Sequence, residues 1–492
     1  MTFVFRAQVA QRILFGVLGA LSAVDSLHLL AQDVAAVSTQ EGGPVITRLT
    51  QQSVLEPERL PVLVQEESVT DLNRATLQEP DRAVAPASFR AASFPVPSSR
   101  EVPIGPMPAE SIRLQNGLGQ LSVSGAISLL GVNATDRAFV PWNPLFMLPP
   151  SLLGDDNATF ELHGRQSNLQ FLYAGPKLGQ WDTGAFAKFY FTNSTMTSDV
   201  YGFMPVVAFG EVRNENFRLS AGLQPDLFAP RDPVVIPLTL MGGTGNAGTF
   251  RGQLRGEAYW KPSESLQGTL QAAISDPIST ILIDASRRST ESDGLPNLEL
   301  RGALGVGELE GLAGGRRERP LEVGVAGMVG RIRNSQIVYD LDDIDPAIPI
   351  RSVIDIGGMS VDTKINLTDR IGVIGEGYFG QGLGTYAGTI FQTFNSQTYR
   401  AIRGQGGFLE AFVYLTNRLH LHGGYGVEGP LRRDLPVSTG SIVRNSAYYS
   451  SLFWDISQSV QYSFQVDYRE TDFLVLQDNS GWIFYNQLAF RF

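Results

Sequence analysis

The sequence predicts an all-β protein: a transmembrane antiparallel β-barrel of about sixteen strands that follows an N-terminal disordered linker. From about residue 114 onward, apolar and polar residues alternate with a period of two, which is typical of strands with one apolar and one polar face. The connections between these strands alternate between tight turns and long loops, as in outer-membrane barrels. The chain also ends inside such an alternating run, "GWIFYNQLAFRF", at Phe492.

The composition excludes several classes of protein. The 492 residues include no cysteine, so a disulfide scaffold, a cysteine-based zinc site and a thiol nucleophile are excluded. The net charge of −11 argues against a nucleic-acid partner, which requires a basic face. No apolar stretch reaches the roughly 20 residues of a membrane-spanning helix. A membrane location would therefore depend on strands.

The first 113 residues predict two segments without a folded core. Arg6 and Arg12 precede an apolar stretch from Ile13 to Val24, which predicts a signal peptide over residues 1–31. An uncleaved amphipathic helix is the alternative. Residues 32–113 carry recurrent prolines and mixed charges with little apolar period. Such a segment buries too little apolar surface to fold, so we expect a mostly disordered periplasmic linker.

Residues 114–492 are predicted to form the barrel. The clearest strand is "TFRGQLRGEAYWK" (249–261), in which apolar and small residues occupy one face and charged or polar residues the other. The same alternation predicts strands at 120–130, 159–174, 181–192, 203–213, 217–225, 249–261, 266–275, 297–306, 321–331, 352–366, 370–381, 404–416, 419–428, 444–456, 459–470 and 482–492.

The connections set the orientation of this barrel. Tight turns at 214–216, 262–265 and 416–418 alternate with long segments such as 226–248 and 382–403. The connection at 307–320 breaks this pattern, because it is long where a short turn is expected. An even strand count places both ends of the barrel on the short-turn side, the periplasm. Closure then requires the last strand to pair with the first, since a spanning sheet leaves no free edge.

The residues on the polar face of each predicted strand are expected to line the lumen. A Lys or Arg on the lipid face at mid-bilayer would cost about 2–4 kcal/mol, so these side chains are expected to point inward. Basic residues cluster on the early strands, and the lumen and selectivity candidates are Arg165, Lys188, Arg218, Arg251 and Arg255. A basic wall would favour anionic solutes. Alternatively, these charges only solvate the channel and pair with neighbouring carboxylates.

The segment "PDLFAPRDPVVIPLTLMGGTGNAGTF" (225–250) is the candidate constriction loop. It holds the position of the third long loop, which folds into the barrel in sixteen-stranded porins. Asp226, Arg231 and Asp232 are the residues that could line the constriction. An exposed rim or a subunit-contact loop is the alternative. The glycine run is not a phosphate loop, because no Lys-Ser or Lys-Thr follows it.

From about residue 118 to its end, the chain resembles the DcaP-like trimeric porins of bacterial outer membranes. In "ATFELHGRQSNLQFLYAGP", Arg165 and Ser167 match the early Arg-x-Ser strand of that family. In "FGEVRNENFRLSAGLQPDLFAP", the matching residues are Ala221, Gly222, Gln224 and Phe228. The terminal Phe also resembles the sorting signal of outer-membrane barrels. The resemblance implies a homotrimer that takes up small organic anions.

The remaining motifs offer little chemistry. His420 and His422 have a spacing that could bind a metal, but no third ligand is evident and lumen lining explains them more simply. The acidic loop 339–348 could bridge calcium or be a solvated loop. No Gly-x-Ser-x-Gly elbow occurs. The sequence therefore predicts no catalytic residue, no metal site and no cofactor.

The expected function is a porin-like channel in the bacterial outer membrane, in contact with membrane lipid, for passive diffusion of small hydrophilic solutes, with anions as candidates. Three alternatives remain open at this point. The first is a structural outer-membrane barrel that anchors the envelope or binds partners. The second is a hydrolase with its site at the barrel rim, and the third is a soluble β-sandwich.

Overall fold

The computed structural model describes residues 112–116, 119–151, 157–193, 200–277, 290–313, 316–338 and 348–492. The predicted signal peptide lies outside the described residues, as do the predicted linker up to residue 111 and residues 339–347 of the acidic loop. Within the described residues, no helix is both long enough and apolar enough to cross a membrane.

The described residues form strands joined by loops that include three short 3-10 helices. The elements are β1 (Ile112–Asn116), β2 (Gly119–Ala134), β3 (Thr159–His163), β4 (Asn168–Ala174), β5 (Asp182–Tyr190), β6 (Met204–Arg213), β7 (Phe217–Pro225), β8 (Phe250–Ser263), β9 (Leu266–Ser275), β10 (Thr290–Ser292), β11 (Asn297–Val306), β12 (Glu310–Gly311), β13 (Arg317–Glu318), β14 (Leu321–Val338), β15 (Ile348–Asn366), β16 (Ile371–Gln381), η4 (Leu383–Tyr386), η5 (Thr389–Phe391), β17 (Arg403–Tyr414), β18 (Leu419–Pro430), η6 (Arg432–Asp434), β19 (Ile442–Asp455), β20 (Val460–Phe473) and β21 (Asn479–Arg491).

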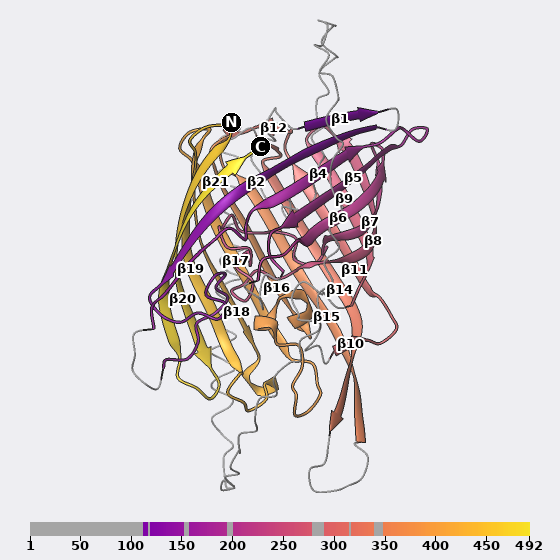
Figure 1. The fold of residues 1–492 in the computed structure, drawn as a ribbon. Coiled ribbons are helices and arrows are strands. Elements are labelled where there is room, and N and C mark those ends of the chain that lie inside the picture. The colour runs from indigo at the N-terminus through magenta and orange to yellow at the C-terminus, as the bar shows by residue number, and fades with distance from the viewer. Residues whose placement is uncertain are drawn as a thin grey trace, which may run out of the picture. The chain divides into compact units, whose positions relative to one another are not determined.

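The strands close into an antiparallel barrel (Figure 1). Each barrel strand pairs with its neighbour in sequence, and β2 pairs with β21 to close the sheet. Both β3 and β4 pair with β2, so they act as one interrupted strand. Counted in this way, the barrel has sixteen strands, as the sequence predicts.

The end of the chain is held by this closure. The backbone N–H of Phe492 donates to the carbonyl of Gly125 at 3.1 Å, and the N–H of Gly125 donates to the carbonyl of Phe492 at 3.0 Å. The last residue is therefore paired, because a closed barrel leaves no free edge for it. β1 continues the pairing with β2 beyond this point, and it begins two residues inside the predicted linker.

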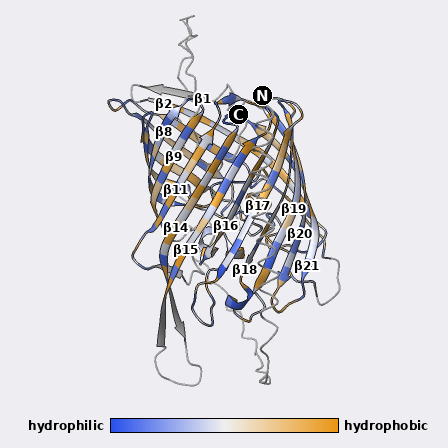
Figure 2. Cartoon of the chain, turned by 180° about the vertical axis from the view of Figure 1, so that it is seen from behind, coloured by the Kyte–Doolittle hydropathy of each residue, from blue (hydrophilic) through white to orange (hydrophobic). Residues whose placement is uncertain are grey.

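The two faces of the barrel follow the alternation of the sequence. On β11, Leu298, Leu300 and Leu304 point outward with about half of their surface exposed, at 53%, 54% and 50%. Glu299 and Arg301 point inward and are buried. Figure 2 shows the same alternation of hydrophobic and hydrophilic residues along β14 and β15. Alternate residues along a strand therefore form an apolar outer face and a charged inner face.

The predicted strand boundaries agree closely with the structure. The strands at 217–225, 266–275 and 297–306 have the predicted limits. The longest hairpin, β14 with β15, extends beyond its neighbours at the long-loop end, as Figure 1 shows. The unusual connection 307–320 contains the small β12–β13 hairpin, and β11 pairs directly with β14 across it.

Candidate functional site

The loop at 226–249 lies inside the barrel and runs along its inner wall. Five backbone N–H groups of the loop donate to inward side chains at 2.6–3.2 Å. In chain order, the donors belong to Leu227, Ala229, Arg231, Val234 and Ile236. The acceptors follow the strands around the wall: Glu299 on β11, Ser360 on β15, Glu376 on β16, Glu410 on β17 and Gln465 on β20. The loop therefore crosses the lumen and is held by polar groups that face inward.

Arg231 attaches this loop to the wall through charge. Its guanidinium contacts Asp362 at 2.8 Å and Glu322 at 2.6 Å. Arg301 on β11 also contacts Asp362, at 2.8 Å. Both arginines and Asp362 are buried. Two cations thus share one buried carboxylate, an arrangement that is stable only while every charge in it keeps a partner.

Asp226 closes the base of the loop. Its carboxylate accepts from the guanidinium of Arg251 at 2.6 Å and from the N–H of Thr249 at 2.8 Å. Arg251 also lies 3.8 Å from the centroid of the Tyr386 ring and donates to the carbonyl of Thr385 at 2.7 Å. These contacts connect the base of the loop to η4, so Arg251 joins two inward loops at the wall.

Asp232 contributes a hydrogen bond between two parts of the loop. It accepts a hydrogen bond from the side-chain amide of Asn246 at 2.9 Å. Asn246 belongs to the returning limb, so this bond joins the two limbs. Gly245 has a φ of +103°, and its Cα lies so close to β17 that an added Cβ would be 2.1 Å from the carbonyl oxygen of Gly407. The loop therefore approaches the wall too closely for a side chain at this position.

Arg218 and Arg255 point inward on β7 and β8. Arg218 contacts Glu211 and Glu257, both at 2.6 Å. Arg255 donates to the carbonyl of Pro225 and lies 3.8 Å from Glu257. Glu257 shares the inward parity of Arg255, so its role as a partner could have been inferred from the alternation in that strand. These two arginines face carboxylates as well as the lumen.

Arg165 and Lys188 have aromatic neighbours. Arg165 lies in the interruption between β3 and β4, with its guanidinium 5.1 Å from the ring centroids of Trp142 and of Tyr201. Lys188 points inward from β5, and its ammonium lies 4.7 Å from the Tyr190 ring. Among the described residues, Lys188 has no carboxylate within salt-bridge distance. Its positive charge is therefore not neutralised by a neighbouring acid in this part of the chain.

Sequence reasoning missed a second inward loop. In the loop 135–151, Trp142, Leu145 and Met147 are buried. The carbonyl of Leu145 accepts from Arg469 on β20 at 2.8 Å and from Asn445 on β19 at 3.1 Å, two and three strands from β2 along the wall. The run "FVPWNPLFMLP" (139–149) is apolar for a loop that faces water, and this was the signal that could have indicated burial.

The two histidines on β18 bind each other. Nδ1 of His420 lies 2.8 Å from Nε2 of His422, and Nδ1 of His422 lies 2.8 Å from Glu410. Tyr449 donates to the same carboxylate at 2.9 Å. The described part of the chain contains no group of three or more acidic or histidine side chains arranged to hold a metal ion. The pair belongs to a hydrogen-bonded network of the inner wall.

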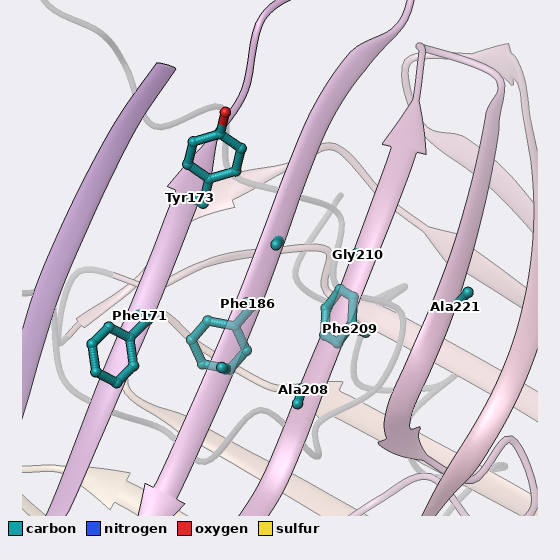
Figure 3. Close-up of a pocket in the computed structure, with 9 residues that line it drawn as sticks. Phe171, Tyr173, Phe186, Ala208, Phe209, Gly210 and Ala221 are labelled. Atoms are coloured by element: carbon teal, nitrogen blue, oxygen red, sulfur yellow. The ribbon is translucent and has the colours of Figure 1, made fainter. Parts of the chain in front are cut away.

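A shallow groove lies on the outer face of β4–β7, as Figure 3 shows. Apart from Phe171 and Tyr173, the outward side chains that line the groove are small. The outward residues that line it are Phe171, Tyr173, Ala185, Ala187, Ala208, Gly210 and Ala221. This face differs from that of β11, where leucines point outward.

These features define a sixteen-stranded barrel with an inward third loop, the architecture of porin-type channels. No protein-family model matches the chain, and no curated protein matches it. Among solved structures, the outer membrane channel DcaP of Acinetobacter baumannii superposes with a TM-score of 0.57 at 13% identity, over 77% of this chain and 99% of that one. The resemblance predicted from the sequence is thus confirmed at the level of the fold.

Two further structures match less closely. OmpT of Vibrio cholerae, folded in vitro, gives a TM-score of 0.47 at 10% identity, over 78% of this chain and 100% of that one. The anion-selective porin from Comamonas acidovorans gives a TM-score of 0.47 at 8% identity, over 76% of this chain and 99% of that one.

Proposed function

We propose that this protein is an outer-membrane channel through which small hydrophilic solutes diffuse passively. The observation that carries the proposal is a closed sixteen-stranded barrel with an apolar outer face and a charged inner face. An apolar band around a polar interior suits a barrel that spans lipid and conducts water-soluble solutes. Residues 1–31 are the signal peptide in this proposal, and residues 32–113 are the periplasmic linker. The function requires no catalytic residue and no cofactor.

The charges of the inner wall support a preference for anions. Basic candidates lie on the early strands, whereas inward carboxylates such as Glu299, Asp362 and Glu410 lie on later strands. Carboxylates at 2.6 Å offset the charges of Arg218 and Arg251. Lys188 has no such partner among the described residues, so its field acts on solutes in the lumen. Lys188 is the residue we assign to anion preference.

The Lys188→Glu variant tests this assignment. In water, two unit charges about 8 Å apart interact by roughly 0.5 kcal/mol, so reversing one wall charge changes the energy of a passing ion by about 1 kcal/mol. The energy of an anion rises by this amount and that of a cation falls by the same amount, so the ratio of anion to cation permeability changes by a factor equivalent to about 2 kcal/mol, or roughly thirtyfold. We expect the reversal potential in a salt gradient to move toward cation preference by that amount.

Lys177 provides the control for this measurement. Its side chain is 73% exposed and pairs with Asp182, so Lys177→Glu makes the same charge change at a solvated site. We expect Lys177→Glu to leave the reversal potential at the wild-type value. Equal shifts in the two variants would mean that net charge, rather than a lumen site, sets the preference.

The proposed assembly is a homotrimer, with the outer groove of β4–β7 in the contact between copies. Small side chains at Ala185, Ala208 and Gly210 leave room for side chains of a second barrel. The outward leucines of β11, by contrast, suit contact with lipid. A polar pair also points outward near the closing seam, where Tyr462 donates to Asn486 at 2.9 Å. A polar side chain on an outer face is less costly against protein than against lipid.

A structural, non-conducting barrel is the second candidate function. It is favoured by the number of loops inside the lumen, because residues in 135–151, 226–249 and 382–402 are all buried against the inner wall. Current through the purified barrel discriminates between the two functions. A folded barrel that passes no current would support an anchoring role.

A further inference from the structure

The connection between β11 and β14 is longer than joining neighbouring strands requires. Turns such as 264–265 and 456–459 join adjacent strands at the same end of the barrel. The connection 307–320 instead forms its own hairpin from β12 and β13, which Figure 1 shows at the turn end of the barrel. The contacts below come from residues 307–313 and 316–320, which the structure describes.

The connection reaches along the inner face of the barrel wall to β17. The guanidinium of Arg316 lies 4.4 Å from the ring centroid of Tyr414 and 4.8 Å from that of Phe412. Both rings point inward. Since β17 is three strands from β14 and neighbouring strands are about 4.8 Å apart, the connection extends along roughly 14 Å of the wall. Stacking of a guanidinium on two aromatic rings is a favourable contact.

Further contacts hold the connection at β15 and β16. Glu318 pairs with Lys364 at 2.6 Å and accepts from Asn366 at 3.1 Å, both on the inward side of β15. Burial alone would raise the pKa of Glu318, but Lys364 and then Arg316 hold it below its usual value. Glu318 is therefore ionised at neutral pH. The N–H of Ala313 donates to the carbonyl of Asp369 at 2.9 Å, in the turn before β16.

The aromatic surface that receives Arg316 is itself supported. The Tyr414 ring stacks on His420 at 4.8 Å, and His420 stacks on Phe453 at 5.1 Å. One ring thus comes from each of β17, β18 and β19. A stack across three strands gives Arg316 a surface with a fixed position.

We propose that the described parts of this connection, residues 307–313 and 316–320, form a second constriction of the channel at its turn end, in series with the loop 226–249, and that Arg316 holds it in place. The proposal rests on the channel function proposed above. A solute leaving the inward loop on its way to the periplasm would pass beside this connection. Two narrow regions in series add their resistances, so widening or blocking either one changes the conductance.

A single introduced cysteine tests the position of the constriction, because the chain has no cysteine of its own. A Cβ added at Gly311 would meet no atom within 4 Å, so Gly311→Cys is compatible with the fold. The full-length variant is inserted in a planar bilayer, and a bulky charged thiol reagent is added on the turn-end side. We expect the reagent to lower the single-channel conductance.

Gly440→Cys is the matched control. Gly440 is also a glycine whose added Cβ would meet no atom within 4 Å, but it lies in the loop after β18, at the opposite end of the barrel. The same reagent, added for this variant on the loop-end side so that it reaches Gly440→Cys, is expected to leave the conductance unchanged. A second variant, Arg316→Ala, removes the stacking contact and is expected to raise the conductance and its fluctuation.

The outcomes separate this inference from the channel function. If the wild type conducts but neither labelled Gly311→Cys nor Arg316→Ala changes the conductance, the second constriction is wrong and the channel stands. If the folded wild type passes no current, both proposals are wrong. Migration of the unheated, folded barrel on a gel checks that each variant has folded.

Discussion

Replacing Asp362 with alanine is expected to destabilise the barrel by about 3–5 kcal/mol, the cost of removing one partner from a buried ion pair. Asp362 is the carboxylate that Arg231 and Arg301 share, at 2.8 Å from each. Without it, Glu322, which is 31% exposed, remains as a carboxylate partner of both buried guanidinium groups, at 2.6 Å from Arg231 and 3.3 Å from Arg301. The free energy of unfolding in urea, measured on the protein in lipid or detergent, checks this expectation.

Arg331→Gln is the control for that measurement. Arg331 pairs with Asp355 at 2.8 Å, but the two side chains are 44% and 68% exposed. An exposed ion pair contributes little, because water and salt screen it. We expect the unfolding midpoint of Arg331→Gln to match the wild type. A similar decrease in the free energy of unfolding in both variants would contradict a special role for the buried cluster.

Replacing Gly245 with valine is expected to detach the inward loop from the wall. The φ of +103° at this position is strained for any residue with a side chain, and a new Cβ would lie 2.1 Å from the carbonyl oxygen of Gly407. Backbone occupies that space, so the loop must move rather than a side chain. We expect a higher and noisier single-channel conductance from a barrel that still folds.

Gly252→Val provides the comparison. Gly252 lies on the outward face of β8, and an added Cβ would meet no atom within 4 Å. We expect its conductance to equal that of the wild type. If Gly245→Val also conducts like the wild type, the loop 226–249 does not limit the passage of ions.

The strands and their faces could be predicted from the sequence because lipid and lumen impose a period of two. On β11, the residues Leu298, Glu299, Leu300 and Arg301 alternate between the two environments, and each one gives a local signal. The paired C-terminus could also be predicted, since closure requires a partner for the last strand. The inward position of the third loop was expected from its order along the chain.

The pairing of the inward charges could not be predicted in the same way. Arg231 and Asp362 are 131 positions apart, and a wall that curves through sixteen strands decides which charges meet. The sequence therefore indicated a basic wall that includes Arg218 and Arg251, and it left open which carboxylates pair with them. The connection 307–320 was equally hidden, because an inward loop has no periodicity that distinguishes it from an exposed one. The loop 135–151 differs, because its apolar run at 139–149 did carry a signal of burial.

The central claim is that this barrel conducts ions and small solutes, and single-channel current tests it most directly. The full-length, folded protein is inserted in a planar bilayer with a salt gradient across it. We predict current in steps of three, for a trimer, with a reversal potential that shows anion preference. A protein that is folded and inserted but passes no current would contradict the claim.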